Sequence, residues 1–285
     1  MTYATSLDNN LESRICRSMD AGLASERTSH RVFVGVSALL FATSAALTIV
    51  WFESMSAMRG MPMAGGWTMS TVWMRMPGQT WLGAAVSFLG MWVVMMVAMM
   101  MPSLVQMVWH YRQAVDRTGE TRLGRLTALV GVGYFFVWTL FGMAIFPLGV
   151  LLASVEMQRP ALARTVPLAV GVVVLLAGIL QFTAWKTRHL ASCREAPGRD
   201  RTLPADVATA WRHGMRLGLH CAHCCSNLMA ILLVIGVMGI GVMAVVTIAI
   251  TVERLAPTGE RVARVTGAVV VAAGLFLIAQ AVGFG

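Results

Sequence analysis

The stretch "VFVGVSALLFATSAALTIVW", residues 32–51, contains no charged side chain. A helix that crosses the hydrocarbon core of a bilayer needs roughly 20 consecutive apolar residues, and this stretch has that length. The rest of the chain has the same character: of its 285 residues, 57% are hydrophobic and only 12% are charged. Because a soluble domain carries about 25% charged residues, the sequence predicts an integral membrane protein.

Further apolar segments follow this first span along the chain. They cover approximately 81–108, 126–154, 166–185, 217–255 and 263–283. As a single helix, the stretch 217–255 would reach about 60 Å, twice the thickness of a bilayer core. We divide it at the glycines of "GVMGIG", 236–241, into spans 218–235 and 239–254. The prediction is an all-α, polytopic helical membrane bundle of about seven transmembrane helices, or six if 217–255 is one kinked helix.

The loops between these spans alternate in charge. Loop 110–125 carries four arginines and loop 186–216 carries seven Lys or Arg residues, whereas loops 52–80 and 155–165 carry two arginines each. Because Lys and Arg gather in cytoplasmic loops, we expect the two richer loops and the N-terminus to be cytoplasmic.

The predicted organisation is a polar cytoplasmic arm, residues 1–31, followed by a single helical membrane domain, 32–285. The arm lacks the apolar run of a signal peptide. The domain carries a Met-rich outer loop at 52–80. The loop arginines account for the formal net charge of +9, and no nucleic-acid-binding motif accompanies it. We therefore expect contact with the lipid bilayer and no nucleic acid partner.

The segment "HCAHCCSNLM", 220–229, concentrates metal-binding side chains at the start of the fifth span. Its three cysteines are spaced i, i+3, i+4, which places the thiols on one helix face. Thiolate and thioether ligands select Cu(I), and thiolates alone also suit zinc. Free cysteines can also pack as small hydrophobes, which is the interpretation we give to the isolated Cys16. For the cluster we favour a metal site, with candidate ligands Cys221, Cys224, Cys225, His220, His223 and Met229.

Methionines form a second group of candidate ligands. The chain has 22 of them, and the second span contains "MWVVMMVAMMMPS", 91–103. Core packing explains methionines within a span as well as metal binding does. In the outer loop, soft-metal capture is the better explanation. The loop methionines are Met55, Met58, Met61, Met63, Met69, Met74 and Met76. The candidate ligands on the span are Met95, Met96, Met99 and Met100.

The two groups are predicted at comparable depths. Met99 to Met101 lie about 12–15 Å from the inner end of the second span. Cys221 to Cys225 lie about 6–12 Å from the inner end of the fifth. A continuous path of soft ligands from the outer loop to the cysteines is therefore a hypothesis that the sequence supports.

A third pair of candidate ligands, His189 and Cys193, is spaced i, i+4 at the inner end of the fourth span. Two donors make a weak site, and an interfacial anchor of Lys and Arg residues explains this stretch at least as well. We expect Glu253, at the end of the sixth span, to snorkel to the membrane surface or cap its helix.

Four segments resemble the predicted metal-binding integral membrane proteins of the DUF2182 family. They are "MWVVMMVAMMMPS" (91–103), "AGILQFTAWKTRHLASCREAP" (177–197), "GLHCAHCCSNLM" (218–229) and "TVER" (251–254). The resemblance covers residues 80 to 255 and implies a bacterial inner-membrane protein with a metal site. Some relatives are described as membrane copper chaperones for tyrosinase-type enzymes.

The resemblance also implies particular ligands. The matching positions are Cys193, Cys221, Cys224, Cys225, Met95, Met96, Met99 and Met100. The chain departs from the family at 183–186, where the family usually has Thr-Pro-Leu-Lys, and at His189, where it usually has cysteine. Histidine can replace cysteine as a ligand for several metals.

These observations predict a protein that binds a soft metal, Cu(I) in the first place and zinc as the alternative, and delivers it to a partner or across the membrane. The expected partner is a copper-dependent enzyme or a copper carrier protein. The sequence has no nucleotide-binding glycine loop, so we expect transfer to be passive, exchange-driven or partner-driven, without enzymatic activity. The alternatives are a membrane thiol or metal oxidoreductase that uses Cys221, Cys224 and Cys225, and a subunit whose metal only braces the bundle.

Overall fold

The computed structural model describes residues 28–54, 61–63, 67–69, 71–75, 78–116, 122–194, 206–236 and 239–283. The chain divides into two compact units, Met1–Thr43 and Ser44–Gly285. Of the first unit, the structure describes the beginning of the helix Thr28–Ser54. The elements that follow this helix all belong to the second unit.

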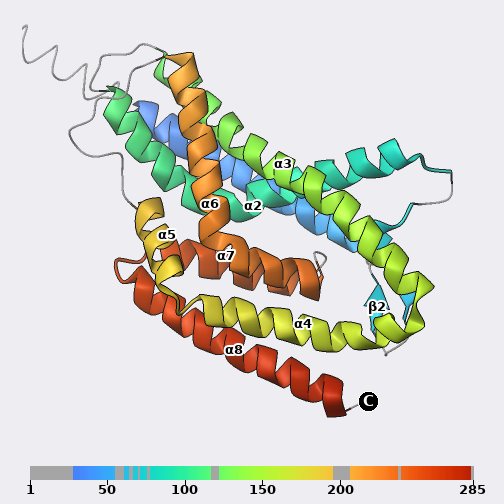
Figure 1. The fold of residues 1–285 in the computed structure, drawn as a ribbon. Coiled ribbons are helices and arrows are strands. Elements are labelled where there is room, and N and C mark those ends of the chain that lie inside the picture. The colour runs from blue at the N-terminus through green and yellow to red at the C-terminus, as the bar shows by residue number, and fades with distance from the viewer. Residues whose placement is uncertain are drawn as a thin grey trace, which may run out of the picture. The chain divides into compact units, whose positions relative to one another are not determined.

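The second unit is built from helices (Figure 1). They are α2 (Trp81–Asp116), α3 (Leu123–Gln158), α4 (Pro160–Leu180), α5 (Ala184–Arg194), α6 (Val207–Ile235), α7 (Ile240–Leu255) and α8 (Gly259–Gly283). Within the outer loop, β1 (Met61–Pro62) pairs antiparallel with β2 (Thr68–Met69), and a short 3-10 helix, η1, covers Thr71–Trp73. The predicted all-α, polytopic helical bundle is confirmed.

Six helices in the described part of the chain are long and apolar enough to cross a membrane: Thr28–Ser54, Trp81–Val115, Leu123–Gln158, Pro160–Leu180, Val207–Ile235 and Gly259–Gly283. Helix α7, which corresponds to the predicted span 239–254, has 16 residues and reaches about 24 Å, which is less than the roughly 30 Å core of a bilayer. Stretch 217–255 forms two helices. Gly236 ends α6 with a φ of 121°, a conformation that side chains other than glycine rarely adopt.

Helix α6 begins earlier than the predicted start at residue 218. Asp206 caps it: the carboxylate accepts hydrogen bonds from the amide of Thr209 at 2.8 Å and from its hydroxyl at 2.7 Å. These bonds lower the pKa of the Asp206 carboxyl. Hydropathy marks only the apolar part of a helix, so the polar first turns were missed.

Close helix approaches fix the directions of the elements. On α3 and α6, Val130 lies against Gly214 and Val137 against Gly218, so these two helices run the same way. A Cβ on Gly214 would overlap the carbonyl oxygen of Val130. Small residues of this kind let helix backbones approach closely in membranes.

Helices α4 and α8 pack side by side in opposite directions (Figure 1). Gly171 of α4 lies against Ile278, and Gly178 lies against Val271, so position rises along one helix as it falls along the other. Helix α8 therefore starts beside the end of α4, and α7 returns the chain from the end of α6 to that point.

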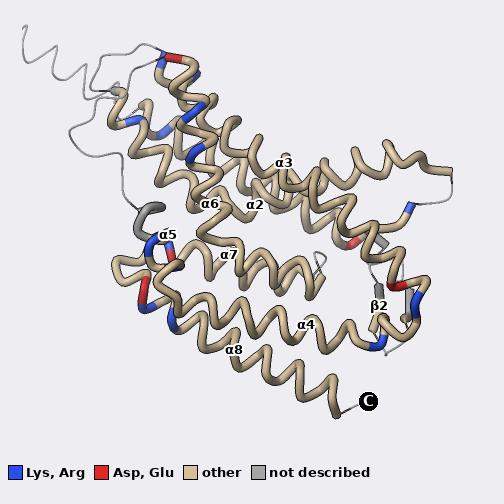
Figure 2. The backbone as a smooth tube through the Cα atoms, viewed as in Figure 1, with Lys and Arg blue, Asp and Glu red and all other residues tan. Residues whose placement is uncertain are grey.

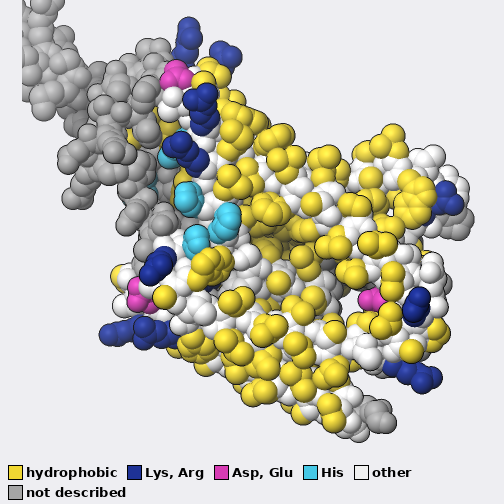
Figure 3. Space-filling view, viewed as in Figure 1, with side chains coloured by type: hydrophobic (Ala, Val, Ile, Leu, Met, Phe, Trp, Pro, Cys, Tyr) yellow, Lys and Arg dark blue, Asp and Glu magenta, His cyan; other side chains and the backbone are white. Residues whose placement is uncertain are grey.

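The outward-facing side chains are largely apolar. Leu82, Val245 and Val282 are 76%, 67% and 68% exposed, and Figure 3 shows hydrophobic side chains over much of α3, α4 and α8. Charged residues lie near the helix ends (Figure 2); α3 has none between Arg125 and Glu156. This distribution is compatible with a multi-pass membrane protein, since lipid replaces water around the middle of each helix.

Candidate metal centre

The methionine helix and the cysteine helix meet in the interior. Met100 Sδ of α2 lies 3.7 Å from Cys221 Sγ of α6, and both residues are fully buried. The contact agrees with the expectation that the two groups lie at comparable depths. The predicted distance of about 6–12 Å from the inner helix end was too short, because α6 starts at Val207 and Cys221 lies about 21 Å along it. Two sulfur atoms from segments 121 positions apart form the core of the candidate site.

Tyr134 of α3 completes the surroundings of Cys221. Its hydroxyl donates a hydrogen bond to Cys221 Sγ at 2.8 Å, and the whole residue is buried. Such a bond becomes stronger when the sulfur is a thiolate, because the acceptor is then charged. The sequence analysis missed Tyr134; a polar hydroxyl in the middle of an apolar span was the available signal.

The three cysteines do not share one set of neighbours. Cys225 donates its thiol hydrogen to the carbonyl oxygen of Cys221 at 2.9 Å, one helical turn earlier on α6. Cys224 instead packs against Leu190 of α5 and Ala263 of α8. Within the described residues, no three His, Cys, Asp or Glu side chains converge on one point.

The other candidate methionines lie on the same two helices as this contact. Met95, Met96 and Met99 are buried on α2, and Met229 is buried on α6. Their burial fits both interpretations that the sequence leaves open for the span methionines, core packing and metal binding. Among the candidate methionines in the described residues, the contact with a cysteine is made by Met100.

The histidines lie on the outside of α5 and α6, where Figure 3 shows imidazole rings at the surface. The rings of His189 and His223 are stacked with centroids 5.6 Å apart, and His220 is exposed. Nδ1 of His223 lies 2.8 Å from the carbonyl oxygen of Leu219. A hydrogen bond there puts the proton on Nδ1 and leaves Nε2 as a potential metal ligand. The side chain of Cys193 lies outside the described residues.

A buried cation borders the sulfur cluster. Arg254 of α7 donates from Nη2 to the carbonyl oxygen of Cys221 and from Nη1 to Ser103 Oγ, both at 3.3 Å. Arg254 is only 5% exposed. It belongs to the "TVER" segment, and it joins α2, α6 and α7 at the candidate site.

A buried ion pair supports the same region. Lys186 Nζ lies 2.8 Å from Glu253 Oε2 and donates to the carbonyl oxygen of Cys224 at 2.8 Å. Gln181 donates to Glu253 Oε1 at 2.9 Å. The expectation that Glu253 snorkels or caps was wrong, as was the placing of Lys186 in an interfacial anchor. Lys186 and Glu253 are each 1% exposed, because α5 folds against α6 and α7.

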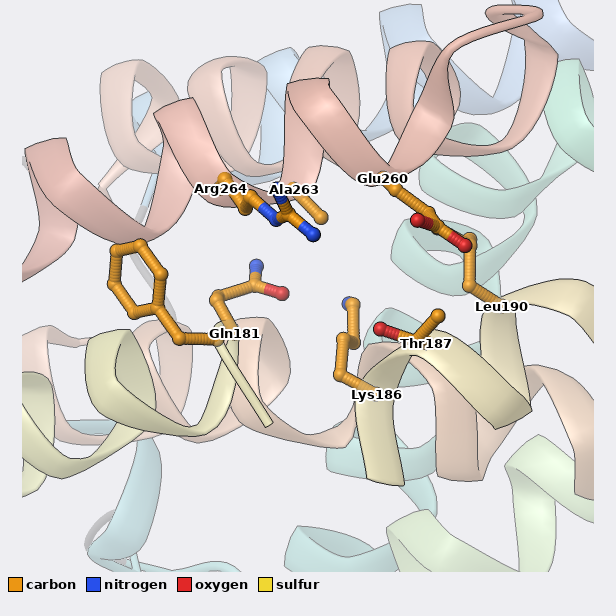
Figure 4. Close-up of a pocket in the computed structure, with 8 residues that line it drawn as sticks. Gln181, Lys186, Thr187, Leu190, Glu260, Ala263 and Arg264 are labelled. Atoms are coloured by element: carbon orange, nitrogen blue, oxygen red, sulfur yellow. The ribbon is translucent and has the colours of Figure 1, made fainter. Parts of the chain in front are cut away.

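A small pocket between α4, α5 and α8 reaches this ion pair. Its polar lining is formed by Gln181, Lys186, Thr187, Glu260 and Arg264. Figure 4 shows the Lys186 and Gln181 side chains pointing toward Glu260 and Arg264 across it. The ion pair is therefore the buried end of a polar region at this end of the bundle.

The Met-rich outer loop is described only in part. Met63 and Met74 are partly buried, and Met61 and Met69 lie in β1 and β2. Met55, Met58, Met76 and the N-terminal Cys16 lie outside the described residues. The loop is joined to the helices by Trp67, whose Nε1 donates to the carbonyl oxygen of Ala163 at 2.9 Å.

The family model PpoB2, described as a copper chaperone, matches residues 89–277. The chain belongs to this copper chaperone family. The match runs from the methionine helix to α8 and includes every element that borders the sulfur cluster. No curated protein matches the chain, and no solved structure does. The resemblance drawn from the four sequence segments is thus confirmed as one to a copper chaperone family, and the PpoB2 match supports a copper-handling role.

The donor chemistry at α2 and α6 fits copper. Two thiols and one thioether are soft ligands of the kind that Cu(I) prefers. The Tyr134 hydroxyl and the Arg254 guanidinium beside Cys221 would stabilise its thiolate, the form that binds metal. The buried position also keeps water from the sulfur atoms. The PpoB2 match does not reach the outer loop at 52–80, whose methionines are a feature of this chain outside the matched region.

Proposed function

We propose that the chain is a copper chaperone of the bacterial inner membrane that binds Cu(I) between α2 and α6 and delivers it to a partner copper protein. The observation that carries the proposal is the contact of Met100 Sδ with Cys221 Sγ at 3.7 Å. It brings together soft ligands from two segments that the sequence marks independently. The copper chaperone family supports the choice of metal.

The proposed ligands are Cys221, Cys225 and Met100. This set uses two of the three predicted cysteines, because the Cys224 thiol packs toward α5 and α8. Three-coordinate sulfur ligation suits Cu(I), whereas zinc favours four ligands. Because Cys224 packs with Leu190 and Ala263, we assign it a packing role in this proposal.

The remaining candidates are proposed to form the route of the ion. Met95, Met96 and Met99 would pass copper along α2 toward Met100, after capture by Met61, Met63 and their loop neighbours. The surface imidazoles His189 and His223, with His220 and Cys193 nearby in sequence, would then accept it for the partner. The 2.8 Å contact of His223 Nδ1 with the Leu219 carbonyl oxygen supports this last step, because it favours the tautomer whose Nε2 can bind a metal.

The proposed orientation has the N-terminus in the cytoplasm. At one end of the bundle, Arg122 precedes α3, and Arg188, Arg212 and Arg261 lie near the starts of α5, α6 and α8. At the other end, Arg159 and Arg164 lie near Glu156. The excess of arginine marks the first end as cytoplasmic. The outer loop would then face the periplasm, where copper is captured.

The test is the Cu(I) affinity of detergent-purified protein, measured without oxygen against competing chelators. We expect tight binding of one ion that is weakened strongly in Cys221→Ser, Cys225→Ser and Met100→Leu. Cys224→Ser is the matched control from the same motif and should bind like the wild type. Equal, weak binding by all five proteins would reject the copper site. Trapping of a mixed disulfide at Cys221 or Cys224 would then point to the oxidoreductase alternative.

A further inference from the structure

Arg254 places a permanent positive charge beside the sulfur ligands. Its guanidinium donates to the carbonyl oxygen of Cys221 at 3.3 Å, so its charge lies next to the first residue of the cysteine cluster. An arginine side chain stays protonated inside proteins. Any metal complex at this site therefore forms next to a fixed cation in a region of low dielectric constant.

The net charge of that complex depends on the metal. Each thiol that binds an ion loses its proton, which leaves for solvent. Two thiolates with Cu(I) carry a net charge of minus one, whereas two thiolates with Zn(II) are neutral. A neighbouring cation stabilises the anionic complex and leaves the neutral complex nearly unchanged.

We propose that Arg254 makes the site selective for a monovalent soft cation over a divalent one. It does so by compensating the negative charge that a dithiolate–Cu(I) complex carries when buried. The inference rests on the proposed function, since it requires Cys221 and Cys225 to bind the ion. Arg254 does not touch the metal; it determines specificity through the charge it holds at the thiols.

A purely structural role makes a different prediction. Arg254 also links α2, α6 and α7 through Ser103 and the backbone of Cys221. If Arg254 only linked the helices, its removal would lower the affinity for every metal by the same factor. The ratio of the Cu(I) and Zn(II) affinities therefore separates the two roles.

The experiment uses the full chain, purified in detergent without oxygen. Affinities for Cu(I), Zn(II) and the redox-inert monovalent probe Ag(I) are measured by chelator competition. In Arg254→Gln we expect the Cu(I) and Ag(I) affinities to fall on the order of 10- to 100-fold, with the Zn(II) affinity nearly unchanged. Arg254→Lys keeps the charge and should keep most of the preference.

A second pair of variants leaves Arg254 in place. Ser103 accepts a hydrogen bond from Arg254, and Ser103→Asp places a carboxylate there that neutralises the charge of Arg254. This variant should therefore lower the preference for Cu(I), as Arg254→Gln does. Ser103→Asn has nearly the same size without the charge and should bind like the wild type. This pair gives the answer if Arg254→Gln fails to fold.

A charge-balanced control comes from the ion pair nearby. The double variant Lys186→Met with Glu253→Gln removes one positive and one negative charge, so the affinity ratio should stay at the wild-type value. Equal losses of Cu(I) and Zn(II) affinity in Arg254→Gln, or in Ser103→Asp, would overturn the inference. If the wild type binds neither Cu(I) nor Ag(I), it is the proposed function that fails.

Discussion

At the scale of single residues, the hydroxyl of Tyr134 is the group whose removal should change copper binding with the least effect on packing. It donates to Cys221 Sγ at 2.8 Å, and Tyr134→Phe removes this bond and little else. A hydrogen bond to a charged acceptor contributes about 1.5–3 kcal/mol. We therefore expect the Cu(I) affinity to fall by about 10- to 100-fold in the chelator competition assay.

The control for this variant is Tyr111→Phe. Tyr111 is also fully buried, on α2, and no hydrogen-bond partner is described for its hydroxyl. Its removal should leave copper binding unchanged. An equal loss of affinity in the two variants would mean that tyrosine hydroxyls act on the bundle as a whole rather than on Cys221.

The ion pair of Lys186 and Glu253 gives a prediction about stability. Glu253→Gln leaves the Lys186 ammonium buried without its counter-ion, and breaking a buried pair in this way costs about 3–5 kcal/mol. We expect a marked loss of thermal stability in detergent. The double variant with Lys186→Met should regain most of it, because no buried charge is then left without compensation. A double variant as unstable as the single one would contradict this account.

Sequence reasoning reached the metal-binding residues but not their partners. The i, i+3, i+4 spacing of Cys221, Cys224 and Cys225 places the thiols on one helix face, and all three are buried. Spacing along one helix cannot say which neighbouring helix each side chain meets. Cys221 contacts Tyr134, whereas Cys224 packs against Leu190. These contacts, like the burial of Glu253, join segments that are distant in the sequence.

At the scale of elements, the parallel packing of α3 against α6 holds Tyr134 at Cys221. Gly214 allows this approach, since a Cβ there would overlap the carbonyl oxygen of Val130. We expect Gly214→Ala to push the helices apart and to destabilise the protein by about 1–3 kcal/mol. Copper affinity should fall with it, because the Tyr134 hydroxyl moves with α3.

Gly131→Ala is the matched control on α3. A Cβ at Gly131 meets nothing within 4 Å, and alanine favours the helix over glycine by about 1 kcal/mol. Thermal unfolding in detergent should show this variant to be at least as stable as the wild type. Similar losses in the two variants would indicate that helix propensity, rather than the close approach, explains the result.

The existence of the helices was predictable, whereas their ends were not. Runs of about 20 apolar residues must be helical in a bilayer, since each backbone amide needs a partner there. Helix α6 begins directly after Asp206 because the side chain of this residue caps it there, and not because the hydropathy changes at that point. The break at Gly236 was predictable, because glycine tolerates the positive φ found there.

At the scale of the second unit, the helix directions make a prediction about topology. Helix α8 begins beside the end of α4, and the pocket lined by Lys186, Glu260 and Arg264 joins the two ends. The turn between α7 and α8 must therefore lie on the same side of the membrane as α5. The turn between α3 and α4 lies on the opposite side, since α4 separates it from α5.

Labelling of introduced cysteines tests this arrangement in whole cells. Thr258→Cys lies in the α7–α8 turn and Gln158→Cys at the end of α3, and both positions are exposed. With the N-terminus in the cytoplasm, a membrane-impermeant maleimide should label Gln158→Cys in intact cells. It should label Thr258→Cys only after the membrane is opened, in a background where Cys16 and Cys193 are replaced by serine. Because α7 spans only about 24 Å, labelling of the two positions from the same side would show that α7 does not return the chain across the membrane.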